Sequence, residues 1–388
     1  NMNNNMNNNM NNMNNNMNNN MNNNTNNMNN MNNMNNNPPD LNSFDRFTRA
    51  TSTGLRNQGN TSHLNAVLQF IGSIQNFASY FTKEKNEQFF LENIPNRPLT
   101  FVTYRLFLHL YKYPENQQRE IYTPDSYLKV LEIENPTSKT VKSINPNELL
   151  IYILDTLHYE LNQPRNNNNI SPKNNYDKTD VIQCGIINFQ NRYNSIMSNL
   201  LNWFQLEEAS CLFCNSTTYS FHTYNTFDLD ILGCSNSNNN NPININNCIL
   251  NKFLTKQKEA YCSICRKNTQ MHFSSKIYFS PTEFIFLLNR GNMDPNLMNI
   301  RFFIEEKINL RNFIENQNAP SLYQLKGIVS IDLKNSKYVS FCMSPVDKNW
   351  YFYNDEVIQL LDLNQVLQFH NNSNSFIPCI LIRSEEHT

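Results

Sequence analysis

Two pairs of closely spaced cysteines constrain the fold of this chain more than any other feature. Cys211 and Cys214 form one CxxC pair, Cys262 and Cys265 form a second, and residues 215–261 separate them. Four thiolates from two tight turns supply the tetrahedral shell that a structural zinc ion prefers. The alternative, ordinary buried thiols or a single redox pair, would require the second matched pair to arise by coincidence. The sequence therefore predicts a structural zinc site.

The remaining cysteines occur singly, in apolar or loop contexts, and are predicted to be packing residues. They are Cys184, Cys234, Cys248, Cys342 and Cys379. The chain has no apolar run long enough to span a membrane, and its N-terminus lacks the pattern of a signal peptide. We therefore expect an intracellular protein, cytoplasmic or nuclear, with no membrane partner.

Charge argues against a nucleic-acid partner. The chain has 31 basic and 32 acidic residues, and the basic residues form no stripe with interleaved aromatic side chains of the kind that follows a phosphate backbone.

Asparagine-rich stretches divide the chain. Residues 1–39 are almost entirely Asn and Met; because Asn is a poor helix former, we expect a disordered tail over 1–47 rather than an amphipathic helix. Further Asn-rich stretches at 163–175 and 235–247 are expected to be insertions in surface loops.

Between these stretches, helical patterns come first and strand patterns later. Apolar residues at helical spacing predict buried helices over 63–81 and 147–161. From about residue 217 onward, short runs rich in β-branched and aromatic residues predict strands, as in 276–288 and 323–331. This order favours an α+β fold with an antiparallel sheet.

Several motifs resemble those of ubiquitin-specific proteases. Segment 54–69 (GLRNQGNTSHLNAVLQ) resembles the family signature GLxNxGNTCxxNxxLQ, which opens the catalytic domain. Later segments follow in the family's order: a helix at 148–158, the CxxC pairs, FIFLLNRG at 284–291, and WYFYNDEVI at 350–358. The resemblance covers residues from about 50 to 382.

The resemblance implies the papain-like hand of this family, in one domain over 48–382 that grips ubiquitin or a ubiquitin-like protein. Its parts would be a thumb at about 50–195, zinc-ribbon fingers at about 200–275 and a palm at about 276–382. The last residues, 383–388 (RSEEHT), look like the translation of a sequencing-library adapter rather than natural sequence.

Carried over residue by residue, the family's catalytic positions have lost their reactive groups. The nucleophilic cysteine falls on Ser62 and the general base on Lys337, and neither residue type suits its role. The base-orienting position falls on Asn354 and the oxyanion donor on Asn57, and both keep a suitable residue type. A serine hydroxyl needs a base to take its proton during attack, and a protonated lysine cannot accept one. His63 is not expected to substitute as base, because neighbouring helical positions point about 100° apart.

The resemblance also assigns ubiquitin contacts to Asn145, Glu148 and Tyr338. Asn145 stands where relatives carry an Asp that engages the ubiquitin tail, so a charge-assisted hydrogen bond is lost. Segment 331–337 (IDLKNSK) contains no glycine, although relatives have a glycine-rich loop before the base.

Three functions remain open. The first is a catalytically inactive pseudo-deubiquitinase that acts as a ubiquitin-binding or scaffold protein. The second is an active deubiquitinase, an isopeptide hydrolase with a Ser62/Lys337 dyad, since such dyads work on other folds. The third is a structural zinc module without affinity for ubiquitin. A sequencing error could explain one changed codon, but a change from His to Lys requires at least two base changes.

Overall fold

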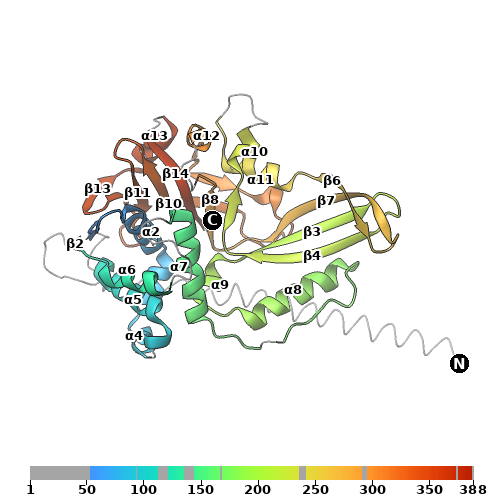
Figure 1. Cartoon of the computed structure of the whole chain (residues 1–388), viewed down its shortest axis with the longest axis horizontal. Helices are drawn as coiled ribbons and strands as arrows, with labels where there is room; N and C mark the ends of the chain where they lie inside the picture. The colour runs from blue at the N-terminus through green and yellow to red at the C-terminus, as the bar shows by residue number, and fades with distance from the viewer. Residues whose placement is uncertain are drawn as a thin grey trace. The chain divides into compact units, whose positions relative to one another are not determined.

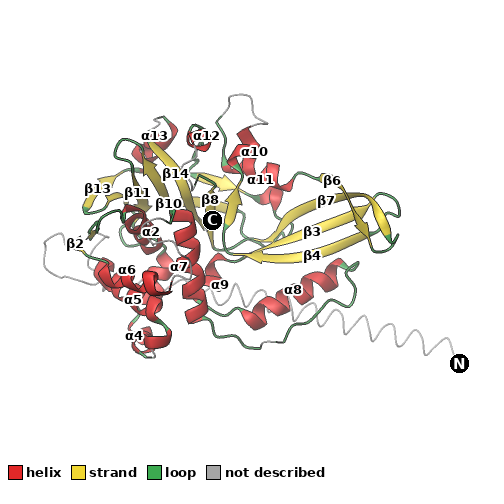
Figure 2. Cartoon of the chain, in the orientation of Figure 1, coloured by secondary structure: helices red, strands yellow, loops and turns green. Residues whose placement is uncertain are grey.

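The computed structural model describes residues 53–92, 94–111, 121–134, 144–166, 168–235, 242–290, 295–372 and 375–386. The tail expected over 1–47 and the last residues, 387–388, lie outside the described residues. Helices and largely antiparallel sheets combine in the described part (Figure 2), which confirms the α+β prediction.

Helices dominate the first half of the described chain (Figure 1). α2 (Ser62–Gly72) is buried along its whole length, and α7 (Pro146–Leu161) packs against it. The other helices of this half are α3 (Gln75–Thr82), α4 (Glu84–Leu91), α5 (Pro98–Tyr111), α6 (Asp125–Glu134), α8 (Lys178–Arg192) and α9 (Ile196–Leu201), with a 3-10 turn η2 (Ile94–Asn96). The helix predicted over 147–161 is confirmed.

The single helix predicted over 63–81 is wrong in one respect, because α2 and α3 are separate helices. Gly72 and Ser73 are weak helix formers at the break, and the Ser73 hydroxyl donates to the Phe70 carbonyl, 2.7 Å away. Ile74 is extended, with a ψ of 107°. The apolar face nevertheless continues across the break, since Ile71 and Ile74 are both buried.

The larger sheet has eight strands, and its order is β13-β12-β11-β10-β14-β8-β5, with β9 paired to β10. All neighbours are antiparallel except β5 and β8. The strands are β5 (Phe227–Leu229), β8 (Glu283–Leu288), β9 (Lys307–Asn309), β10 (Leu322–Asp332), β11 (Lys337–Met343), β12 (Trp350–Asn354), β13 (Val357–Leu361) and β14 (Phe376–Glu385). The strand predicted over 323–331 is confirmed as β10.

The hydrophobic core lies on both faces of this sheet. Side chains alternate between the faces of a strand, so Ile285 and Leu287 of β8 join the core formed with the helices. Phe284, Phe286 and Leu288 join a second core on the opposite face. Every residue of β8 is therefore buried, and the sheet is held between two layers.

A separate four-stranded antiparallel sheet, with order β4-β3-β7-β6, forms the fingers sheet. Its strands are β3 (Trp203–Cys211), β4 (Thr217–Tyr224), β6 (Lys256–Cys262) and β7 (Lys267–Phe279). Helix α8 packs along β4. In Figure 1 the four strands run away from the larger sheet towards the turns that carry the paired cysteines.

The short helices of the second half are α10 (Ile231–Ser235), α11 (Ile245–Phe253), α12 (Pro295–Met298) and α13 (Leu363–Asn371), with a 3-10 turn η4 (Arg311–Phe313). The surface loop expected over 235–247 extends too far, because α11 begins at Ile245. Asn244 caps α11 by accepting from the backbone N–H of Asn247, at 2.9 Å, so part of this Asn-rich stretch forms the start of a helix.

Both ends of the described chain are tied into the fold. β1 (Gly54–Leu55) pairs with β2 (Ile121–Tyr122), and a Cβ atom at Gly54 would lie 2.6 Å from the carbonyl oxygen of Glu356, so only glycine fits there. β14 continues to Glu385, beyond the palm boundary expected at 382. Within it Arg383 is fully buried; the adapter origin of 383–388 stays a prediction.

Candidate functional site

The residues at the catalytic positions come from three elements that meet beside the larger sheet. Ser62 begins α2, Lys337 begins β11 and Asn354 ends β12. α2 packs closely against β11 (Figure 1), and β11 pairs with β12. The fold therefore brings these three positions to one end of α2.

Ser62 is only 8% exposed. Its hydroxyl oxygen accepts a hydrogen bond from the backbone N–H of Tyr338, at 3.3 Å. This bond ties the start of α2 directly to the residue after Lys337. The hydroxyl group is thus engaged by the strand rather than by a side-chain base.

Lys337 directs its ammonium group to a carboxylate. Its Nζ atom lies 3.3 Å from Oδ2 of Asp355, whose side chain is 8% exposed, while that of Lys337 is 35% exposed. In the described part of the chain the hydrogen bond of this ammonium group goes to Asp355 and not to Ser62.

Asp355 is a residue of this site that the sequence reasoning missed. It adopts a left-handed conformation, with a φ of 54°, in the turn after β12, a conformation that Asp and Asn tolerate better than most residues. Besides Lys337, its carboxylate accepts from the side-chain amides of Asn57 (3.0 Å) and Asn65 (2.9 Å). The signal was present, because Asp355 directly follows Asn354 in the segment that resembles the family's third catalytic residue.

Among the described residues, no hydrogen bond joins Asn354 to Lys337. Its side-chain oxygen is buried and lacks a hydrogen-bond partner in that part of the chain. The acceptor role expected at this position is thus filled, in geometric terms, by the next residue.

Asn57 is the expected oxyanion donor. Both the oxygen and the nitrogen of its side-chain amide already make hydrogen bonds within the protein. Its oxygen accepts from the backbone N–H groups of Gly59 (3.0 Å) and Thr61 (3.2 Å), which shapes the turn before α2. Its nitrogen donates to Asp355 at 3.0 Å. The donor that would stabilise a developing oxyanion is therefore bound to a carboxylate.

His63 is 4% exposed and packs edge-on against the ring of Tyr338, with 6.3 Å between ring centroids. A packing histidine was the expected alternative to a substitute base.

The expected ubiquitin-contact residues lie at two places. Asn145 caps α7, because its side chain accepts from the backbone N–H of Glu148 at 2.9 Å. Glu148 is exposed in the first turn of α7, where the helix dipole favours an acidic residue. Tyr338 is half-buried on β11, next to Lys337, and burial raises the pKa of its hydroxyl group.

The glycine-free stretch 331–337 forms a tight turn between β10 and β11. The Asp332 carboxylate accepts from the backbone N–H groups of Lys334 (3.0 Å) and Asn335 (3.3 Å). Ser336 adopts a left-handed φ of 51°. This turn is therefore fixed by its own side chains, unlike a flexible glycine-rich loop.

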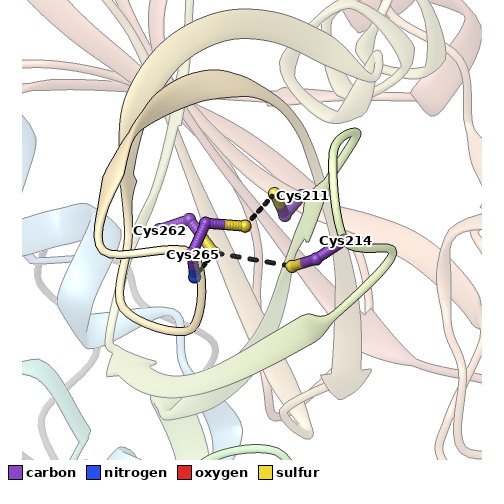
Figure 3. A group of neighbouring side chains, drawn as sticks. All are labelled: Cys211, Cys214, Cys262 and Cys265. Atoms are coloured by element: carbon purple, nitrogen blue, oxygen red, sulfur yellow. Dashed lines mark hydrogen bonds between the residues drawn. The ribbon is translucent and has the colours of Figure 1, made fainter.

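The four paired cysteines form one cluster at the ends of the fingers strands (Figure 3). Their sulfur atoms all lie within 4.8 Å of one another. The distance is 3.7 Å from Cys211 to Cys265 and 3.8 Å from Cys214 to Cys262. A tetrahedral ion with Zn–S bonds of about 2.3 Å would hold its sulfurs about 3.8 Å apart, whereas a disulfide bond is about 2.05 Å long. The cluster could therefore bind a metal ion.

The backbone of each CxxC turn is built in the same way. Asn215 and Arg266, which follow the second cysteine of each pair, both have a φ of 56°. Their N–H groups donate to the carbonyls of Cys211 (2.9 Å) and Cys262 (2.8 Å). Each turn thereby folds back so that both of its sulfurs face the same point.

The surroundings of the sulfurs favour thiolates at two of the four positions. A hydrogen bond with Ser216 lowers the pKa of Cys214 to about 6. The backbone N–H of Cys265 lowers the pKa of the Cys262 thiol. The neighbouring thiols raise the pKa of Cys265 to about 12, but a bound divalent ion would deprotonate it as well.

The remaining cysteines are buried, as expected of packing residues. Among the described helices, none combines the length and the apolar character that crossing a membrane requires.

Comparison with known proteins relates most of the described chain to one family. The family model described as ubiquitin carboxyl-terminal hydrolase matches residues 53–377. Ubiquitin carboxyl-terminal hydrolase Usp2 of Drosophila melanogaster is 21% identical over 335 residues, a match that covers 82% of this chain. The chain spans only 34% of the length of that relative.

Among solved structures, chains of the SAGA DUB module Ubp8/Sgf11/Sus1/Sgf73 share the fold. The module bound to monoubiquitin matches with a TM-score of 0.61 and 15% identity, covering 88% of this chain and 70% of that chain. The module bound to ubiquitin aldehyde matches with a TM-score of 0.62 and 14% identity over the same shares. At this identity the likeness shows the fold, which is that of ubiquitin-specific proteases.

Proposed function

Because this chain belongs to the ubiquitin carboxyl-terminal hydrolase family, we propose that it is a pseudo-deubiquitinase, a ubiquitin-binding or scaffold protein that has kept the fold without the hydrolysis. One observation carries the proposal. The nucleophile position holds Ser62, and the base position holds Lys337, whose ammonium group pairs with Asp355 at 3.3 Å. Such a protein would act in the cytoplasm or nucleus.

The chemistry of the two positions supports inactivity. A cysteine protease relies on a thiol acidic enough to be held as thiolate by an imidazole. A serine hydroxyl has no comparable acidity, so it needs a base that accepts its proton during attack. An ammonium group held by a carboxylate is already protonated and cannot accept that proton.

The surrounding contacts support the same proposal. The amide nitrogen of Asn57, at the oxyanion position, donates to Asp355 at 3.0 Å, and the Ser62 hydroxyl accepts from the Tyr338 N–H. A ubiquitin tail entering between α2 and β11 would have to break that contact. The turn at 333–336, fixed by Asp332, offers less freedom for such an opening than a glycine-rich loop.

The alternative function is an active hydrolase that uses a Ser62/Lys337 dyad. It would require the lysine to leave Asp355, lose its proton and reach the Ser62 hydroxyl. A ubiquitin substrate with a fluorogenic C-terminal leaving group separates the two functions. We expect no turnover above background for the wild type; turnover that disappears in Ser62→Ala would overturn the proposal.

Ubiquitin or a ubiquitin-like protein is the proposed partner, in view of the family and of structural neighbours that are bound to ubiquitin. Asn145, Glu148 and Tyr338 are the proposed contacts. Calorimetric titration of ubiquitin should show binding that Glu148→Lys weakens. Glu132→Lys, at an exposed site on α6, is the matched control. Absence of wild-type binding at about millimolar concentration would favour a zinc module without ubiquitin affinity.

Zinc is the proposed metal of the four-cysteine cluster. The sulfur distances of 3.7 and 3.8 Å fit a tetrahedral thiolate shell, and four soft sulfur donors suit zinc better than calcium or magnesium. A closed shell of four protein ligands makes the site structural, because no position is left for substrate.

A further inference from the structure

The two metal-binding turns expose apolar side chains that the metal site does not use. We call the turns 212–215 and 263–266, with the adjoining Tyr261, the fingertip. The middle residues of each CxxC turn point outward: Leu212 is 44% exposed, Phe213 67% and Ile264 50%. Tyr261 is 62% exposed beside them. Apolar side chains that gather at one exposed place in this way mark an interaction site.

Two basic residues lie at this apolar group. Arg266 and Lys267 directly follow Cys265, and segment 260–273 around them contains no Asp or Glu. The facing segment, 209–224, contains no Asp, Glu, Lys or Arg. At the tip itself, the Lys267 ammonium group lies 3.2 Å from the centroid of the Phe213 ring, so the cation is in contact with the apolar side chain.

The fingertip lies at the end of the fingers sheet that is remote from the main core. Trp203, at the start of β3, belongs to the core under the larger sheet. Cys211, at the end of β3, belongs to a small separate cluster with Cys262 and Met271. The cysteine sulfurs of the two turns lie within 4.8 Å of one another, so one flat surface can contact both turns.

We propose that the fingertip is a peripheral membrane-binding surface for anionic phospholipid bilayers. Phe213 and Ile264 would enter the boundary between headgroups and acyl chains, while Arg266 and Lys267 contact the anionic headgroups. Protruding apolar side chains beside a cluster of Lys and Arg are the features that bind a protein to such an interface. The expectation of no membrane partner rested on the lack of a spanning segment, which does not bear on peripheral contact.

Charge complementarity favours a lipid surface over a protein partner. At the tip Arg266 and Lys267 stand without an acidic residue in the same stretch of chain, 260–273. An anionic bilayer attracts Lys and Arg alike, with a contribution of roughly fivefold in affinity for each cation near the surface. The association should be weak, with a partition constant on the order of that of one myristoyl chain, ~10⁴ M⁻¹.

Flotation of the full chain with phospholipid vesicles tests the proposal. We expect binding to phosphatidylcholine vesicles that contain phosphatidylserine, and little binding to pure phosphatidylcholine. Phe213→Ser and Ile264→Ser should each weaken binding by roughly tenfold, because each removes a side chain that would be buried in the interface. Arg266→Glu with Lys267→Glu should weaken it at least as much, and added salt should weaken wild-type binding.

Matched controls separate the fingertip from the rest of the surface. Leu250→Ser removes a side chain that is 55% exposed on α11, and Lys85→Glu reverses an exposed charge on α4; neither should change vesicle binding. Metal content and circular dichroism of each variant report whether the fingertip still folds. The proposal is overturned if the wild type floats with neither vesicle, if the controls lose as much binding as the fingertip variants, or if the fingertip variants lose ubiquitin binding while vesicle binding is unchanged.

Discussion

The ammonium group of Lys337 lies 3.3 Å from the carboxylate of Asp355, at the position where the family's base would face its nucleophile. The same carboxylate accepts from the amides of Asn57 and Asn65. Three elements thus converge on the acid in the turn after β12: the loop before α2, α2 itself and β11. The arrangement has the character of a structural cross-link between α2 and the sheet.

A double-mutant cycle should detect this cross-link. Lys337→Met leaves a nearly buried carboxylate without its cation, and Asp355→Asn keeps a residue that tolerates the left-handed φ of 54°. We expect each change to lower the free energy of unfolding, with a coupling energy of about 1–2 kcal/mol in urea denaturation.

The matched control is the exposed pair of Arg56 and Glu356, also 3.3 Å apart, whose side chains are 56% and 43% exposed. Its coupling energy should be below about 0.5 kcal/mol and should shrink further in salt. Equal coupling in the two pairs would contradict a structural role for Lys337.

A bound metal ion should stabilise the two cysteine turns more than the rest of the fold. The cysteine cluster forms its own small core with Met271, so chelation should unfold the turns 212–215 and 263–266 while the larger sheet stays folded. Hydrogen exchange measured by mass spectrometry would show faster exchange in β3, β6 and β7 next to the turns.

Elemental analysis checks the ligands of this site. We expect one zinc ion for each wild-type chain and almost none in Cys214→Ser or Cys265→Ser, because a missing thiolate opens the four-coordinate shell. Cys184→Ser, at a buried cysteine outside the cluster, should keep its metal. Zinc retained after loss of a cluster cysteine would argue against four-cysteine coordination.

Local patterns predicted some of these features well and others poorly. The bounds of α7 followed from its apolar period, and the metal cluster followed from ligand spacing within two turns. Asp355 could not be chosen over Asn354 in this way. The choice depends on the left-handed turn after β12, which aims one of two adjacent side chains at α2. The apolar pattern could not predict the break between α2 and α3, because the buried apolar face continues through it.

Glu283 should make stability depend on pH. It is 3% exposed at the start of β8, and burial raises the pKa of its carboxyl group to about 7. Because this pKa is higher in the folded protein than the ordinary value of about 4.5, the contribution of Glu283 to stability is fully present below pH 4.5. It is lost as the pH rises through about 7, at a cost of up to about 3 kcal/mol.

Glu283→Gln should therefore raise the free energy of unfolding at about pH 8 and change it little at about pH 4. Ser384 and Asn76 now donate to different oxygens of the carboxylate; the amide oxygen of glutamine can accept from Asn76, while its amide nitrogen can donate to the Ser384 hydroxyl oxygen. Chemical denaturation at several pH values measures the difference, and Glu132→Gln, at an exposed site on α6, should leave the profile unchanged. A Glu283→Gln effect of equal size in acid and in base would mean that titration is not its cause.

Restoring both lost groups should restore some hydrolysis. In Ser62→Cys alone, the thiol would still face a strand that offers an ammonium group instead of an imidazole. In Lys337→His alone, the imidazole would face a hydroxyl group of ordinary acidity. Catalytic groups that act as a unit give non-additive effects, so each single variant should stay at background with a fluorogenic ubiquitin substrate.

The double variant Ser62→Cys/Lys337→His should exceed the single variants by about 100-fold, the low end of what a positioned base contributes. Removal of the lysine also frees the Asp355 carboxylate, 3.3 Å from the present ammonium group, to orient the new imidazole. Alkylation of the introduced thiol in the double variant, and its suppression by ubiquitin aldehyde, would show that this thiol is reactive and lies where the ubiquitin tail binds. A double variant as inert as the single ones would attribute the proposed inactivity to the Asn57–Asp355 contact and the glycine-free turn rather than to the two exchanged residues.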